Sequence, residues 1–148
     1  MKIYRLAAFA LPLIFVAAAC GGNSSSSTTT STTSTTVKTV NGYEIKPGAN
    51  LQNADLEGVD LKNAQLNNAN LSGANLKYAE IQGINLAGAN LTGTNFYWSD
   101  LTGANLINAV IKKTNFTGAN LFKAQINEGA LEDAIIKETG LPDGTFKK

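Results

Sequence analysis

An apolar side chain recurs every five residues from Leu51 to Phe146, at twenty successive positions in one register. The residue two places before each of these centres is usually small, and Gly or Asn often follows two places after it. This period matches neither an α-helix, with about 3.6 residues per turn, nor the two-residue alternation of a strand. It predicts a solenoid of short extended pieces and corners, in which each unit buries its apolar side chain by stacking.

The individual units carry a family resemblance. Residues 74–78 (Ala-Asn-Leu-Lys-Tyr) and 119–123 (Ala-Asn-Leu-Phe-Lys) are similar to the repeats of pentapeptide-repeat proteins, and the resemblance covers about Pro47 to Phe146. It implies an all-β fold, a right-handed quadrilateral β-helix of about five coils with terminal caps. Four units make one coil, with the centre and the small residue inside. The small position departs from the pattern at Ile84, Thr94, Ser99, Thr114, Gly129, Thr139 and Gly144.

With four units per coil, residues twenty apart stack at a strand spacing of about 4.8 Å. One interior column then runs Leu56, Leu76, Phe96, Phe116, Ile136, which places the two phenylalanines on each other. Ile84, at a position that is otherwise small, is expected to crowd its interior layer.

The chain divides into four predicted segments. Residues 1–19 form a lipoprotein-type signal peptide, and residues 20–36 a lipidated cysteine with a Ser/Thr-rich disordered tether. Residues 37–48 form an N-terminal cap, and residues 49–148 the solenoid, with a C-terminal cap from about Ala134. Open solenoid ends expose unpaired backbone, so end-to-end homodimers are a further expectation.

The amino terminus indicates export. Lys2 and Arg5 precede an uncharged apolar run from Leu6 to Ala19, which is too short to span a bilayer core of about 30 Å. Small residues directly before Cys20, the chain's single cysteine, resemble a bacterial lipobox. Cys20 would become the lipid-anchored amino terminus; the alternative is an ordinary signal peptide with an unmodified cysteine. The Ser/Thr-rich stretch that follows has no apolar residue with which to build a core.

The composition excludes several functions. The chain has no His, and its single Arg and single Cys lie in or directly after the signal, so no Ser-His-Asp or Cys-His site can form. Zinc sites, which use Cys or His, are excluded likewise. Without the signal, ten Lys oppose eleven acidic residues, a net charge of −1, which argues against nucleic acid as a partner. We expect no enzymatic activity, metal or cofactor.

A column of carboxylates is the strongest candidate for ion chemistry. Asp60, Glu80 and Asp100 are twenty residues apart at the same outward position, where they repel one another. A hard cation such as Ca²⁺ would relieve that repulsion. The alternative is that the position simply accepts acids and amides. A flat ladder of this kind also lacks the cleft that a carboxylate-dependent enzyme needs.

The best candidate binding patch combines three aromatic and two acidic residues: Tyr78, Tyr97, Trp98, Glu80 and Asp100. Tyr78 and Trp98 share an outward column, Tyr97 adjoins Trp98, and the column leads to Glu80 and Asp100. Amphipathic rings are favoured anchors at interfaces, for a protein or a glycan. Single surface aromatics, in contrast, require no function.

These features favour a non-catalytic, extracytoplasmic binding or scaffold module, anchored to a bacterial membrane through Cys20 and facing a protein or glycan of the cell envelope. Two weaker alternatives are open. One is a DNA mimic that binds a topoisomerase, as the resemblance allows, and the other is a carboxylate enzyme that acts on envelope polymers.

Overall fold

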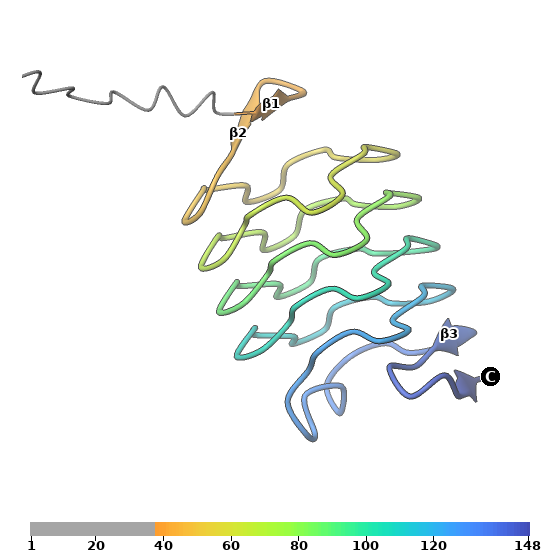
Figure 1. Ribbon diagram of the computed structural model, residues 1–148. Helices are drawn as coiled ribbons and strands as arrows, with labels where there is room; N and C mark the ends of the chain where they lie inside the picture. Colours follow the sequence, from red (N-terminus) through yellow and green to blue (C-terminus); the bar gives the residue numbers. More distant parts are fainter. Residues whose placement is uncertain (1–37) are drawn as a thin grey trace, which may run out of the picture. The chain divides into compact units, whose positions relative to one another are not determined.

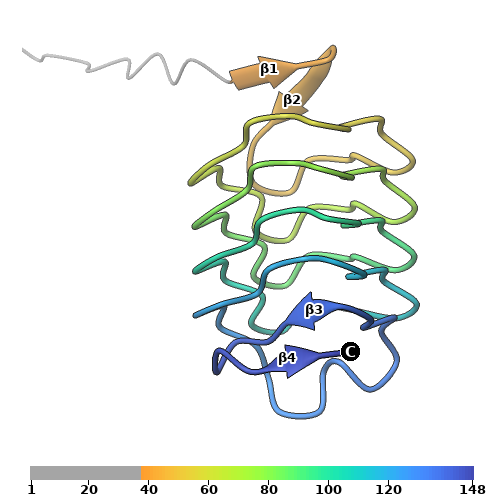
Figure 2. The ribbon, with the colours of Figure 1, turned by 90° about the vertical axis from the view of Figure 1, so that its right-hand side faces the viewer.

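The structure, a computed structural model, describes residues 38–148. The predicted signal peptide and the predicted tether with Cys20 lie outside the described residues. Among residues 38–148 there is no helix long and apolar enough to cross a membrane. The chain winds as stacked four-sided coils between a short N-terminal hairpin and a less regular C-terminal end (Figures 1 and 2).

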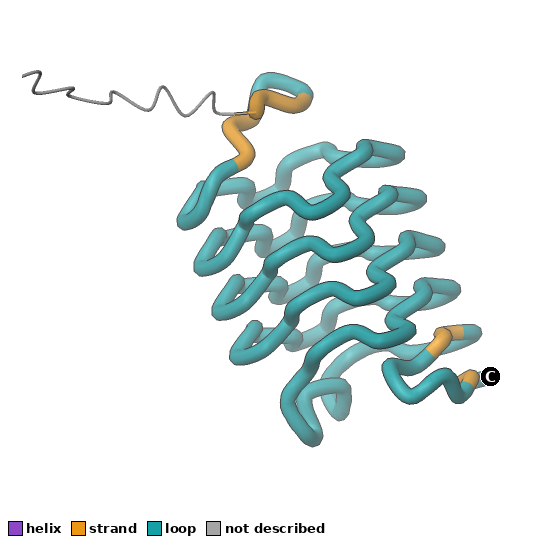
Figure 3. Tube along the Cα trace, viewed as in Figure 1, coloured by secondary structure: helices purple, strands orange, loops and turns teal. Residues whose placement is uncertain are grey.

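Each side of the coil stack is a ladder of very short extended pieces. We number the faces by their first interior centre: the first to fourth faces start at Leu51, Leu56, Leu61 and Leu66. Most of the stack is loop by conformation, because each extended piece pairs through a single residue before the chain turns (Figure 3). Pairing between coils therefore replaces the long strands of an ordinary sheet.

Parallel backbone pairing joins residues twenty apart. On the second face, the Leu76 N–H donates to the Asn95 carbonyl at 2.8 Å, and the Asn95 N–H donates to the Ala74 carbonyl at 2.9 Å. Bridges of this kind connect four coils on every face and a fifth on the second and third faces, where they reach Ile135 and Gly140. The backbone polar groups of the extended pieces are thus satisfied within the stack.

The interior contains the predicted centres and small residues. Most centres from Leu51 to Leu121 are fully shielded from solvent, and Ile84 is buried with them. The rings of Phe96 and Phe116 lie parallel, 5.3 Å apart between centroids and 4° between planes, so their predicted stacking is confirmed.

Threonines at the small position satisfy their hydroxyl groups across the coils. The Thr94 hydroxyl donates to the Leu71 carbonyl and the Thr114 hydroxyl donates to the Leu91 carbonyl, each at 2.7 Å. Because a buried hydroxyl without a partner costs about 1–3 kcal/mol, these bonds make threonine acceptable beside the phenylalanines.

The N-terminal end carries a two-stranded hairpin within the segment predicted as a cap. Strands β1 (Lys38–Val40) and β2 (Tyr43–Ile45) pair antiparallel across a two-residue turn. Asn41 and Gly42 both have positive φ, as a type I′ hairpin turn requires. Val40, Tyr43 and Ile45 pack against the core.

The C-terminal end departs from the predicted register. Residues 128–133 form turns, as in the Glu132 N–H bond to the Gly129 carbonyl, and do not continue the ladder of the first face, while the ladder of the fourth face ends at Gln125. Strand β3 (Thr139–Gly140) then pairs antiparallel with β4 (Phe146–Lys147). The prediction that Phe146 is an interior centre is wrong: a turn from Leu141 to Thr145 reverses the chain, and Phe146 is 62% exposed.

Candidate functional site

The structure brings the three predicted aromatic residues into contact at one corner of the second face. The rings of Tyr78 and Tyr97 meet edge to face with centroids 5.8 Å apart, and those of Tyr97 and Trp98 are 6.4 Å apart. Tyr78 and Trp98 are each 55% exposed, while Tyr97 is partly buried between them. We call these three residues the aromatic corner.

The backbone at this corner is unfavourable for large side chains. From Asn53 to Lys123 the last residue of each unit takes a left-handed conformation, and most of these positions hold Gly or Asn. Tyr78 and Trp98 adopt the same conformation, with φ of 56° and 52°. That costs an L-residue with a β-carbon about 1–2 kcal/mol. Large aromatic side chains are therefore unexpected at a corner that most units fill with Gly or Asn. Backbone strain of this size often marks a functional position.

Gly118 forms the surface against which Trp98 rests. A β-carbon at Gly118 would lie 2.6–2.7 Å from atoms of the indole ring, closer than real side chains approach. The indole therefore covers the α-carbon of the next coil, and glycine at that position is required by the ring as well as by its φ of 70°.

A groove of about 510 Å³ continues from Trp98 toward the C-terminal end. Its aromatic walls are Trp98 and Phe146, and its small residues are Gly118, Ala119 and Gly140. The polar residues Asn120 and Glu138 complete it. We call it the Trp98 groove. Sequence reasoning missed Phe146 and Glu138, because the groove exists only once the chain reverses after Leu141.

The acidic members of the predicted patch are engaged on the third face. Asp100 accepts hydrogen bonds from the Thr102 N–H at 2.9 Å and from the Gln82 side chain at 2.8 Å. Partial burial raises the pKa of Asp100, but the hydrogen bonds from Thr102 and Gln82 outweigh it and hold the pKa below its usual value. Glu80 forms an ion pair with Lys62.

Lys62 supplies the positive charge for the predicted cation column. Its ammonium group contacts both Glu80 and Asp60, and the hydrogen bond to Glu80 raises the pKa of Lys62. The backbone N–H of Lys62 lowers the pKa of Asp60. No group of three or more acidic residues between 38 and 148 is arranged to hold a metal ion. Lys62 therefore lowers the electrostatic repulsion between Asp60 and Glu80 that a bound cation would otherwise lower.

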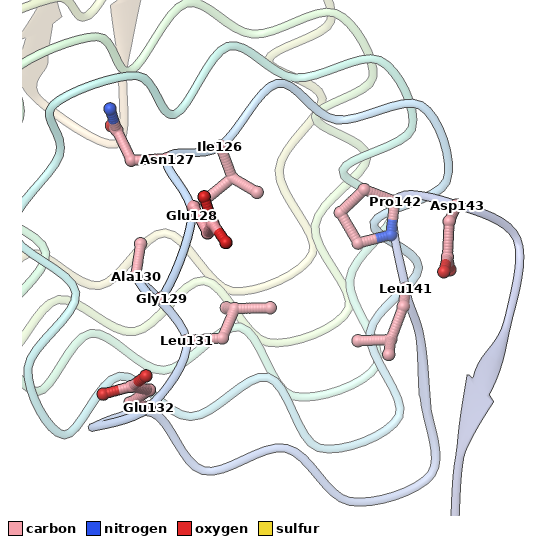
Figure 4. Close-up of a pocket in the computed structure, with 10 residues that line it drawn as sticks. All are labelled: Ile126, Asn127, Glu128, Gly129, Ala130, Leu131, Glu132, Leu141, Pro142 and Asp143. Carbon is pink, nitrogen blue, oxygen red and sulfur yellow. The ribbon is translucent and has the colours of Figure 1, made fainter.

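A cavity of about 680 Å³ lies at the C-terminal end of the stack. Figure 4 shows it between the 126–132 segment and residues 141–143. Its apolar lining includes Ile126, Leu131 and Leu141, and three carboxylates surround these side chains: Glu128, Glu132 and Asp143. Hydrogen bonds from Thr145 lower the pKa of Asp143, which keeps it ionised. We call this cavity at the C-terminal end the end cavity.

Comparison with known structures finds similar proteins, three of which follow. A pentapeptide repeat protein from the Arabidopsis thaliana thylakoid lumen is 28% identical with a TM-score of 0.48, over 62% of this chain and 61% of that one. HetL, involved in heterocyst differentiation regulation in the cyanobacterium Nostoc sp. strain PCC 7120, is 28% identical with a TM-score of 0.30, over 68% and 50%. QnrB1, a plasmid-mediated fluoroquinolone resistance protein, is 16% identical with a TM-score of 0.36, over 65% and 62%.

This chain thus spans less than two thirds of each of those structures. Comparison with curated proteins finds no match. The family model for pentapeptide repeats matches eight copies, over residues 48–77, 69–106 and 99–137. Those repeats cover more than half of the chain. It belongs to the pentapeptide-repeat family, whose members fold as right-handed quadrilateral β-helices and are generally structural or binding proteins without catalytic activity.

Proposed function

We propose that this protein is a non-catalytic binding or scaffold module of the bacterial cell envelope. Lipidated Cys20 anchors it to the membrane, and the Ser/Thr-rich segment after Cys20 separates the coils from the lipid surface. The coils present the aromatic corner to an envelope partner, either a protein or a glycan.

The aromatic corner is the observation that carries the proposal. Tyr78 and Trp98 are exposed at positions where the backbone favours Gly or Asn, so the fold itself has no need of them. Large, half-exposed aromatic residues are the side chains that most often dominate binding energy at interfaces. Three rings in contact make one surface rather than scattered single residues.

The alternative functions have less support. A DNA mimic needs a continuous acidic surface, whereas Asp60 and Glu80 are paired with Lys62. The acids predicted for a carboxylate enzyme are already engaged: Asp100 accepts hydrogen bonds from Thr102 and Gln82, and Asp60 and Glu80 contact Lys62. Export would also separate the protein from cytoplasmic DNA enzymes.

The test compares two double variants in living cells. Tyr78→Ala with Trp98→Ala removes the aromatic corner, and Val110→Ala with Phe122→Ala removes two exposed apolar side chains elsewhere, 44% and 40% exposed. Proximity labelling from the coil domain should lose its main envelope partners only in the first variant. Equal labelling by both variants, with both folded by circular dichroism, would remove the aromatic corner as the binding surface.

The anchor is tested separately through Cys20. Wild-type protein should take up a metabolically supplied fatty-acid label and sediment with membranes. Cys20→Ser should lose the label, because the modified atom is the cysteine sulfur. If the wild-type protein is exported but carries no label and does not sediment with membranes, the lipid anchor is ruled out. The binding module would then stand without an anchor.

We also retain end-to-end pairing as a proposal, with the end cavity as the contact. Burial of Ile126, Leu131 and Leu141 would favour pairing, while a two-fold contact would bring Glu128, Glu132 and Asp143 near their own copies. Salt screens such repulsion. The dimer fraction in analytical ultracentrifugation should therefore rise between low and high salt, and a monomer under all conditions would contradict pairing.

A further inference from the structure

We propose that the Trp98 groove binds a neutral pyranose unit of a polysaccharide, with the flat face of the sugar against the indole. This inference rests on the proposed function, because it names the chemical class of the partner at the same surface. It adds Phe146 and Glu138 to the residues that bind.

The shape of the groove suits a flat ring. One side of the Trp98 indole rests on Gly118, and the side chain as a whole remains 55% exposed, which leaves ring surface for a ligand. Phe146, 62% exposed, stands as the second aromatic wall. Gly140 has no side chain, which leaves room for a ring between the two walls. An aromatic ring can contact the apolar face of a ligand while the polar edge of that ligand remains hydrated.

The polar groups of the groove match hydroxyl groups. The Glu138 carboxylate accepts no hydrogen bond from any residue between 38 and 148, so its oxygens are available to hydroxyl donors on a ligand. Asn120 is already committed, because its side chain donates to Thr102 and accepts from the Phe122 N–H. Glu138 is therefore the residue that orients the ligand.

Charge and lining distinguish a sugar from other ligands. Glu138 is the one charged residue of the groove lining, and its carboxylate opposes an anionic ligand. The groove contains no Leu, Ile, Val or Met side chain, whereas pockets for peptide anchors are built largely from such groups. A neutral ring with an apolar face and a polar rim fits both conditions.

The chain provides its own reporter, since Trp98 is its single tryptophan. Full-length protein in detergent is titrated with cellotetraose, chitotetraose and maltotetraose while the fluorescence of Trp98 is recorded. We expect a saturable change in intensity or wavelength with at least one of these sugars. Glu138→Gln and Phe146→Ala, which keep the reporter, should each raise the dissociation constant at least tenfold.

Matched controls exclude indirect effects. Glu128→Gln changes the carboxylate at the same position of an earlier sequence unit, and Phe122→Ala removes an aromatic ring of the third face. Both should bind the sugar as the wild type does. Circular dichroism and thermal unfolding check that Phe146→Ala keeps its fold, and Glu138→Gln decides the outcome where Phe146→Ala is destabilised.

The outcomes separate this inference from the proposed function. No saturable change with any of the three sugars, or binding unaffected by Glu138→Gln, overturns the sugar site. If the double variant of Tyr78 and Trp98 still loses its envelope partner in that case, the binding module stands and its partner is a protein. If neither experiment shows an effect, both proposals fail.

Discussion

The second and fourth faces share one backbone but differ in the size of their side chains, inside and outside. The second face contains the Phe96–Phe116 stack and, at its corner, Tyr78 and Trp98. The fourth face has Leu106 and Ile126 at the matching interior positions and Gly88 and Asn108 at the matching corner. Both corners have positive φ. The coil therefore requires an interior of suitable volume and a left-handed corner, and it is indifferent to aromatic rings outside.

The interior of the two faces should give the largest difference. Phe96→Ala removes half of a stacked pair and should lower the free energy of unfolding by about 3–5 kcal/mol. Leu106→Ala, at the matching position of the fourth face, should cost less, because it breaks no aromatic pair worth about 0.5–1.5 kcal/mol. Denaturant unfolding followed by circular dichroism measures both. A larger loss for Leu106→Ala would reverse the comparison.

Glycine at the two corners should give an intermediate difference. Gly88→Ala and Gly118→Ala both place a β-carbon at positive φ, at a cost of about 1–2 kcal/mol. At Gly88 the new methyl group meets the tip of the Asn68 amide, which can rotate away, while at Gly118 it meets the indole ring.

Gly118→Ala should therefore lose about 1 kcal/mol more than Gly88→Ala, in line with the cost of overpacking. It alone should shift the fluorescence of Trp98. Equal losses with an unchanged spectrum would mean that the indole does not rest on Gly118.

The corner backbone itself should give the smallest effect. Trp98→Gly and Trp98→Ala lose the same ring, and only Ala keeps a β-carbon at positive φ, so the Gly variant should be more stable by about 1 kcal/mol. Asn108→Gly and Asn108→Ala should show the same difference on the fourth face. Thermal unfolding of the four variants checks this. A Gly–Ala difference at Asn108 alone would show that the backbone at Trp98 is unstrained.

Periodicity predicted the regular part of the fold because each residue of a coil has one role. The step of five places a side chain inside or outside, and the step of twenty places it next to its neighbour. These two steps were enough to predict the Phe96–Phe116 stack and the proximity of Tyr78, Tyr97 and Trp98.

The end of the stack could not be predicted from the same steps. Leu131 and Leu141 continue the apolar period, but the chain forms turns at residues 128–133 and after Leu141 in place of regular coil sides. No further coil follows to pair with these residues. Phe146 consequently lies outside, where it completes the Trp98 groove. The neutralising role of Lys62 was missed for a different reason: it depends on the conformation of a long side chain rather than on register.

The twenty-residue circuit also determines how such a gene can change in length. A duplication of twenty residues adds one full circuit and returns every later side chain to the side it occupied before. A duplication of five residues turns all later residues by a quarter of a circuit. Placed between Trp98 and Gly118, the short duplication would leave the indole without its glycine support, while the core pattern would still be intact. Selection for binding would thus favour growth by whole circuits, even where stability alone would accept shorter steps.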